Sequence, residues 1–161
     1  MEKYINRFKL SNEWLCILTL LITSYVIIIP SALLSELFPS LTLGGNPNIE
    51  NHPSIYVQFC IAVIIAPIIE TLIFQTLPVF VLKDGLNLRY SIICIVSATA
   101  FAASHPFSIG YIIFSFIMGL LFVYAYLLIA ETQKSPFRIV CVTHGLRNFL
   151  AIGASHYFLS P

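Results

Sequence analysis

The chain has 161 residues, of which 58% are hydrophobic and only 9% are charged, and its net charge is +1. Because soluble globular domains typically carry about 25% charged residues, this composition excludes an ordinary water-soluble fold. A nearly neutral chain also offers no basic surface for nucleic acid. We therefore expect one integral membrane domain that is surrounded by the lipid bilayer and has no nucleic-acid partner.

Five long apolar segments follow one another along the chain. They cover approximately residues 14–34, 54–82, 90–104, 108–129 and 137–158. A membrane-spanning helix needs ~20 apolar residues, whereas the strands of a membrane barrel alternate in polarity over ~10 residues. The sequence thus predicts an all-α integral membrane protein, a bundle of about five transmembrane helices. Pro30 is expected to bend or end the first of them.

The basic residues outside these segments all fall on one side of a five-span arrangement. They are Lys3, Arg7 and Lys9 before the first segment, Lys83 and Arg89 after the second, and Lys134 and Arg138 after the fourth. Since Lys and Arg are enriched in cytoplasmic loops, we expect a cytoplasmic N-terminus and a C-terminus outside. Arg147 is the exception, because it lies within the fifth segment.

An acidic residue, Glu70, lies in the middle of the second apolar segment. A charged side chain at membrane depth costs roughly 3 kcal/mol or more, so such residues usually line a cavity or pair with another group. Pro67 lacks a backbone N–H and is expected to free the carbonyl of Val63, an irregularity tolerated where the backbone lines a cavity. Glu70 is therefore either a general acid or base or one half of a structural pair with Arg147.

Two histidines lie in later segments. His105 directly precedes Pro106, which disfavours helical geometry and predicts that the third segment ends there; Phe101, one turn earlier, would form an apolar wall beside it. His144 and Asn148 are four residues apart and share one helix face, where an amide can donate to an oxyanion. The alternatives are an interfacial His105 in contact with water, and a polar clamp between helices at His144 and Asn148.

Three patterns therefore lie on separate segments in a fixed order: Glu70-x-x-x-Phe74-Gln75, Phe101-x-x-x-His105 and His144-x-x-x-Asn148. In this the chain resembles the CAAX-protease and bacteriocin-processing (CPBP) family of intramembrane proteases. That family has the motifs Glu-Glu-x-x-x-Arg, Phe-x-x-x-His and His-x-x-x-Asn or Asp. The resemblance covers the second to fifth segments. It makes residues 54–158 the catalytic helix bundle and residues 1–37 a cytoplasmic tail with an added transmembrane helix.

The resemblance implies a role for each of four residues. Glu70 and His105 would activate the attacking water, and His144 and Asn148 would stabilise the oxyanion. The first motif departs from the family pattern, because Thr71 replaces its second Glu and Gln75 replaces its Arg. Arg147 is a candidate to supply the missing positive charge from another helix.

Metal dependence is a separate question. Two histidines and one carboxylate can bind zinc with an open position for water, and the same residues can also act without a metal. With only one Glu, a metal site would leave no separate carboxylate as the base. We therefore expect no cofactor, with zinc as the alternative.

These observations predict an intramembrane endopeptidase of the bacterial inner membrane, acting on a membrane-associated or lipid-modified protein or peptide. The oligomeric state stays open. One alternative is a catalytically silent immunity or scaffold protein with the same fold, which the Thr71 and Gln75 departures favour. Another is a small transporter that uses Glu70 and the histidines as a proton relay.

The proposed site makes a demand on the helix geometry. At ~1.5 Å per residue, His144 lies ~9 Å along its helix from Arg138, but His105 lies ~24 Å from Arg89. The two histidines meet only if the third segment tilts, if residues 84–89 form an interfacial stretch, and if the second segment ends near Pro78.

Overall fold

The structure, a computed structural model, describes residues 12–38 and 54–159. Its elements are α2 (Glu13–Leu37), α4 (Ile55–Phe59), η1 (Cys60–Ile65), α5 (Ala66–Thr71), η2 (Leu72–Thr76), η3 (Val79–Gly85), α6 (Tyr90–Ala103), α7 (Ile109–Ala130) and α8 (Pro136–Leu159). The elements from α4 to η3 form one helix of 31 residues, Ile55–Gly85. Five helices therefore stand where five apolar segments were expected, and the all-α fold class is confirmed. The basic residues 3, 7 and 9 lie outside the described residues.

Three of these helices are long and apolar enough to cross a membrane. They are Glu13–Pro30 within α2, the long helix Ile55–Gly85, and α7. Helix α6 has only 14 residues, which is short of the ~20 needed for a full span. The chain is therefore an integral membrane protein, and full crossing by α6 and α8 stays a prediction.

Helix α2 runs through Pro30 and continues to Leu37, so Pro30 does not end this helix, and the other expected outcome, a bend, stays a prediction. Proline removes one backbone hydrogen bond, but a membrane helix tolerates this loss where neighbouring groups make up for it. The large apolar side chains along its outer face support a lipid-facing surface, since soluble monomers rarely expose contiguous apolar patches of this extent. Leu15, Leu18, Ile22, Val26 and Ile29 are all exposed.

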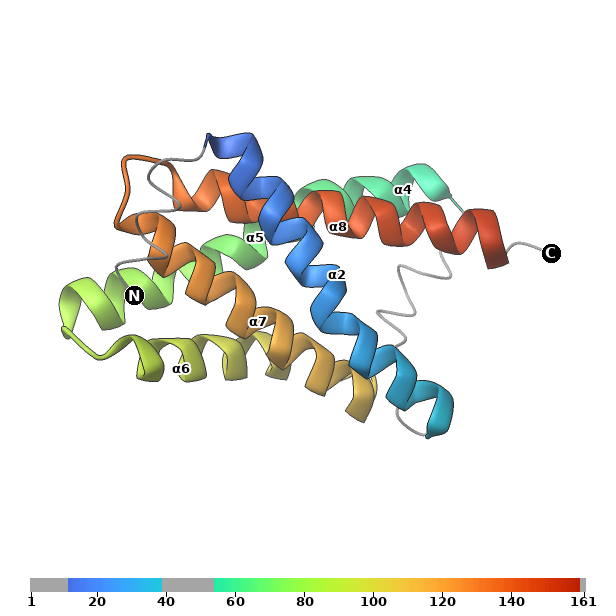
Figure 1. The fold of residues 1–161 in the computed structure, drawn as a ribbon, viewed down its shortest axis with the longest axis horizontal. Helices are drawn as coiled ribbons and strands as arrows, with labels where there is room; N and C mark the ends of the chain where they lie inside the picture. Colours follow the sequence, from blue (N-terminus) through green and yellow to red (C-terminus); the bar gives the residue numbers. More distant parts are fainter. Residues whose placement is uncertain (1–11, 39–53, 160–161) are drawn as a thin grey trace.

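Helix α7 lies at the centre of the bundle, against α6, α2 and α8 (Figure 1). Its contact with α6 is close because Gly119 has no side chain: a β-carbon there would lie 3.0 Å from the Cα of Ala98. Small residues of this kind let membrane helices approach one another. The hydroxyl of Ser97 on α6 donates to the carbonyl of Phe74 on η2, which ties α6 to the long helix as well.

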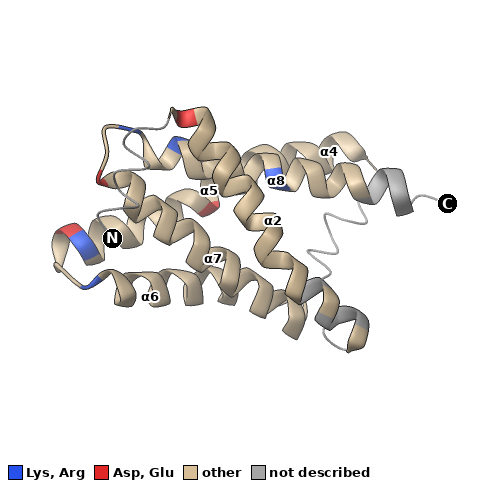
Figure 2. Cartoon of the chain, viewed as in Figure 1, with Lys and Arg blue, Asp and Glu red and all other residues tan. Residues whose placement is uncertain are grey.

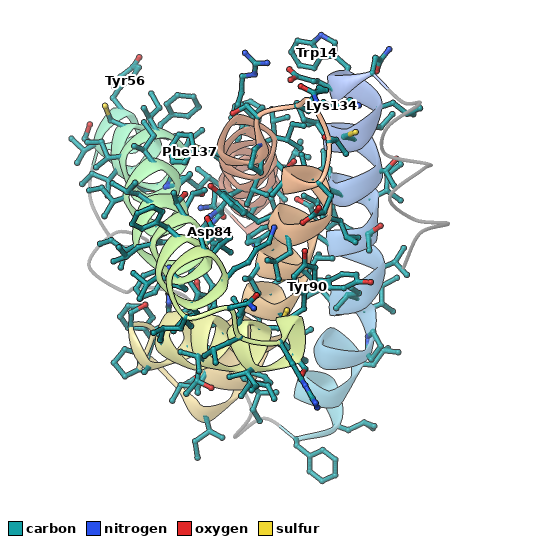
Figure 3. All side chains as sticks on the ribbon, turned by 90° about the vertical axis from the view of Figure 1, so that its left-hand side faces the viewer. Trp14, Tyr56, Asp84, Tyr90, Lys134 and Phe137 are labelled. Carbon is teal, nitrogen blue, oxygen red and sulfur yellow. The ribbon has the colours of Figure 1, made fainter. Side chains whose placement is uncertain are left out.

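Charged residues gather at one end of the bundle, on the left in Figure 2. Lys83 pairs with Glu131 at 2.5 Å, and the Tyr90 hydroxyl donates to the same carboxylate at 2.6 Å. Arg138 pairs with Glu13 at 2.5 Å. Figure 3 views this end, with Asp84, Tyr90 and Lys134 labelled. The η3–α6 and α7–α8 connections thus lie at the same end, as the charge pattern predicted.

Candidate active site

A local irregularity in the long helix shapes the site. In η1 the hydrogen bonds span five residues, so the N–H of Ala66 bonds to the carbonyl of Ile61 and not to that of Ala62. The next residue that could serve Ala62 is Pro67, which has no N–H. The Ala62 carbonyl is therefore left without a backbone donor. Wide turns of this kind in a helix frequently mark functional sites.

The side chain of Asn148 donates a hydrogen bond to the Ala62 carbonyl. Its Nδ2 donates to the Ala62 oxygen at 2.8 Å and joins α8 to η1. Beside it, the carbonyl of Val63 faces Gly145, where a β-carbon would lie only 2.6 Å from the oxygen. The backbones of α8 and η1 therefore approach each other closely at Gly145. The sequence predicted that Pro67 would free the carbonyl of Val63. The carbonyl that accepts a hydrogen bond from a side chain is instead that of Ala62, one residue earlier in the chain.

Glu70 on α5 lies between the two histidines. Its Oε1 is 3.7 Å from Nε2 of His105, in the turn after α6, and its Oε2 is 3.6 Å from Nε2 of His144 on α8. Both distances exceed a direct hydrogen bond and are suited to groups that share a water molecule. Two imidazoles, one from the turn after α6 and one from α8, thus converge on the carboxylate of α5, as expected from the sequence.

Hydrogen bonds hold the imidazole of His105 in one orientation. Its Nδ1 lies 2.8 Å from the carbonyl of Phe101 and 3.0 Å from Oγ of Ser104. Because a carbonyl only accepts, Nδ1 carries a proton, and Nε2 faces Glu70; Nε2 is an acceptor in the neutral form of the ring. Ser104 was not identified from the sequence, although its place directly before a candidate histidine was a usable signal.

His144 is buried among aromatic rings. Its ring centroid lies 5.0 Å from that of Phe122 and 6.2 Å from that of Phe101. The ring of Phe101 also packs 4.6 Å from His105, so the apolar wall expected from Phe101 is present and borders both imidazoles. Electrostatic interactions beside these rings are stronger than in bulk solvent.

Arg147 faces away from Glu70. Its guanidinium lies 4.8 Å from the Phe114 ring on α7 and 5.9 Å from the Tyr25 ring on α2. Among residues 12–38 and 54–159, the ion contacts of Glu70 are with the two histidines. The alternatives in which Arg147 pairs with Glu70, or replaces the missing arginine of the first motif beside it, are therefore wrong.

The two histidines lie close together although they are at different distances from the starts of their helices. His105 follows the start of α6 by 15 residues and His144 follows the start of α8 by eight, a difference of about 10 Å in rise. The long helix does not end near Pro78 but continues to Gly85, so that expectation is wrong. Residues 86–89 between η3 and α6 are not helical, whereas an interfacial position of residues 84–89 and a tilt of α6 stay predictions. Helices α2 and α7 cross the other helices obliquely (Figure 1).

Comparison with known families agrees with this geometry. Residues 52–150 match the family described as type II CAAX prenyl endopeptidase Rce1-like. The chain belongs to this family. The match covers more than half of the chain and contains all three motifs, which confirms the CPBP resemblance and makes the chain a CAAX-type intramembrane endopeptidase in general terms. No curated protein and no solved structure was found to match it.

The two departures from the Rce1-like family's first motif are buried. Thr71 and Gln75 are both fully inaccessible, and Oγ1 of Thr71 and both amide atoms of Gln75 have no hydrogen-bond partner among the described residues. Because Thr71 and Gln75 are uncharged, neither position holds an unpaired buried charge. Burying such a charge would cost more free energy than burying an unpaired amide. Glu70 therefore holds the only acidic side chain of this motif, with histidines as its ionisable neighbours.

Zinc would have to use Glu70, His105 and His144. Their chemistry suits the metal, but in the described part of the chain no group of three His, Cys, Asp or Glu side chains has an arrangement that could hold a metal ion. Both Nε2 atoms face the carboxylate itself across less than 4 Å. Metal dependence stays a prediction, and we derive no step through a metal.

Proposed function

We propose that this protein hydrolyses a peptide bond within the membrane, with Glu70 as the general base. The observation that carries this proposal is the single carboxylate held between two imidazoles from other helices, at 3.7 and 3.6 Å. Membership of the Rce1-like family supports the reaction class. The roles of the individual residues are our assignment.

The first step is attack by water. The water molecule donates one hydrogen bond to Glu70 and one to the bare Nε2 of His105, which aims an oxygen lone pair at the scissile carbonyl carbon. Glu70 takes one proton as the C–O bond forms, and the carbonyl π electrons move to the oxygen. Positioned general bases typically contribute 10²–10⁴-fold to the rate.

The second step stabilises the oxyanion and expels the amine. Nε2–H of His144 donates to the oxyanion, and so does the second amide N–H of Asn148, since its first N–H donates to Ala62. Preorganised donors of this kind are worth about 10²–10³-fold in rate each. The C–N bond then breaks, and the proton held by Glu70 moves to the leaving nitrogen. One water is consumed, giving a carboxylic acid and an amine.

The substrate class follows from the family and the surroundings. The matching family is named for CAAX prenyl endopeptidases, and the apolar outer surface lies open to lipid. We therefore propose a membrane-associated or lipid-modified protein or peptide as substrate. We also propose that residues 54–158 form the catalytic bundle and that the charged end with Lys83 and Arg138 faces the cytoplasm of a bacterial inner membrane.

The decisive experiment compares purified wild-type protein in lipid nanodiscs with the Glu70→Gln variant. Wild type should cleave a lipid-modified peptide library, detected by mass spectrometry. Glu70→Gln keeps the volume of the side chain but cannot accept the proton, and should lose at least about 100-fold in rate. Equal cleavage by both proteins would overturn the assignment.

A catalytically silent immunity or scaffold protein is the second candidate, favoured by the neutral Thr71 and Gln75. In that case Glu70→Gln would retain the biological effect in cells, and wild type would cleave nothing. The phenotype of this one variant separates the two functions, provided that its abundance in the membrane equals that of wild type.

A further inference from the structure

The catalytic group lies far from the charged end of the bundle that holds Lys83 and Arg138. Glu70 precedes Gly85, the last residue of η3, by 15 residues, which is about 22 Å of helix. His105 lies in the turn between α6 and α7, so both of these helices end at the site and run from it toward the charged end (Figure 1). The hydrocarbon core of a bilayer is about 30 Å thick. With the charged end at one membrane surface, the site therefore lies nearer to the opposite surface.

Packed side chains close the space between the site and the charged end. Thr71 and Gln75, which follow Glu70 along the long helix, are both fully buried. Helices α7 and α8 add six apolar side chains that are at most 1% exposed: Phe122, Val123, Leu127, Ile129, Ile139 and Val140. Protein interiors of this kind are packed as densely as organic crystals. A peptide therefore cannot reach Glu70 through this layer.

Exposure increases on the opposite side of the catalytic group. Among the described residues, Phe107 in the α6–α7 turn and Ile109 at the start of α7 are both exposed. The side chains of Glu70 and His105 are 20% and 14% exposed, whereas that of His144, on the side of the packed layer, is 8% exposed. The carboxylate is therefore accessible from the side of His105 and the α6–α7 turn, past an apolar rim.

We propose that the substrate is an exported protein or peptide, anchored in the outer leaflet, and that it reaches Glu70 from the outer side of the inner membrane. The proposal rests on the proposed peptidase function and on the cytoplasmic position proposed for the charged end. The scissile bond would lie within roughly 10 Å of the outer surface of the hydrocarbon core. A chain held in the outer leaflet by an apolar segment or a lipid can enter to this depth, whereas one held in the cytoplasmic leaflet faces the packed layer.

The test adds acylated peptides with several charged residues to two kinds of vesicle from cells that make the protein. The acyl chain inserts into the exposed leaflet, and the charges prevent the peptide from crossing the bilayer. Right-side-out vesicles expose the outer face of the membrane, and inverted vesicles expose the cytoplasmic face. Wild type should cleave at least about 10-fold faster in right-side-out vesicles, and detergent should abolish this difference. Glu70→Gln in both kinds of vesicle measures cleavage by other proteases.

Equal Glu70-dependent cleavage in the two kinds of vesicle, or faster cleavage in inverted vesicles, would overturn access from the outer side while leaving the peptidase function intact. If wild type cleaves the peptides only in detergent, or not at all, labelling with a membrane-impermeant maleimide decides the access, and in the second case the peptidase function also fails. Ile109→Cys, beside the α6–α7 turn, should then be labelled above the wild-type level in right-side-out vesicles. Asp84→Cys, the matched control at the charged end, should be labelled in inverted vesicles. Any other labelling pattern overturns the proposal.

Discussion

Gly145 packs its backbone directly against the carbonyl of Val63, at a distance that leaves no room for a β-carbon. A β-carbon at this position would lie 2.6 Å from that oxygen and 3.9 Å from Cγ of Pro67. The contact holds α8 against η1 one residue after His144, so the position of His144 relative to Glu70 depends on it.

Gly145→Ala is therefore expected to destabilise the protein, because the obstructing atom belongs to the backbone and cannot rotate away. Overpacking of this kind typically costs 1–3 kcal/mol, and activity should fall further as His144 moves away from Glu70. Thermal unfolding in detergent measures the first effect and peptide cleavage the second.

Gly153 on the same helix provides the control. Among the described residues, no neighbouring atom lies within 4 Å of a β-carbon at that position, so Gly153→Ala should be neutral or stabilise by up to ~1 kcal/mol through helix propensity. Equal melting temperatures for the two variants would contradict the close contact at Gly145.

The bond from Asn148 to Ala62 leads to a double-substitution test. Asn148→Ala should cost roughly 1–3 kcal/mol, because it leaves the half-buried Ala62 carbonyl without a donor. Pro67→Ala supplies a backbone N–H five residues after Ala62, which can bond to that carbonyl in the wide turn. The penalty of Asn148→Ala should therefore be smaller in the Pro67→Ala background. Strictly additive penalties in thermal unfolding would show that Pro67 is not what frees this carbonyl.

His105 and Ser104 should differ in the size of their effects on catalysis. His105→Ala removes the acceptor that orients the water in the proposed mechanism and should lower kcat by about 10²–10⁴-fold. Ser104→Ala removes one contact of Nδ1 but leaves the bond to the Phe101 carbonyl, so kcat should fall only a few-fold. Comparable losses in kcat for the two variants would argue against direct participation of His105.

The sequence predicted the helices well because each is a long apolar run whose ends carry charge, proline or glycine. It also predicted that Glu70, His105 and His144 come together, through the family resemblance and not through helix lengths, which argued against it. The wide turn of η1 was not predictable, since it depends on the contacts that its carbonyls make with Gly145 and Asn148 of α8, which is distant in the sequence. The orientation of Arg147 likewise depends on rings from α2 and α7.

Metal removal tests the mechanism proposed for Glu70. In the proposed mechanism Glu70 is the base and no metal takes part, so activity should survive dialysis against 1,10-phenanthroline in nanodiscs. A carboxylate that holds a metal cannot serve equally as the base, so the two mechanisms give opposite results. Loss of cleavage that added zinc restores would replace the present assignment with a metal-dependent one.

Replacing the buried amide of Gln75 is expected to stabilise the protein, whereas Gly145→Ala and Asn148→Ala are expected to destabilise it. Both of its polar atoms are buried without a partner in the described part of the chain, and each such atom costs free energy that an apolar side chain of similar shape does not. Gln75→Met should therefore raise the melting temperature. Gln58, a second buried glutamine on the long helix, does have an interaction partner, so Gln58→Met should lower it. A destabilised Gln75→Met variant would mean that the amide is bound, with buried water as the natural partner.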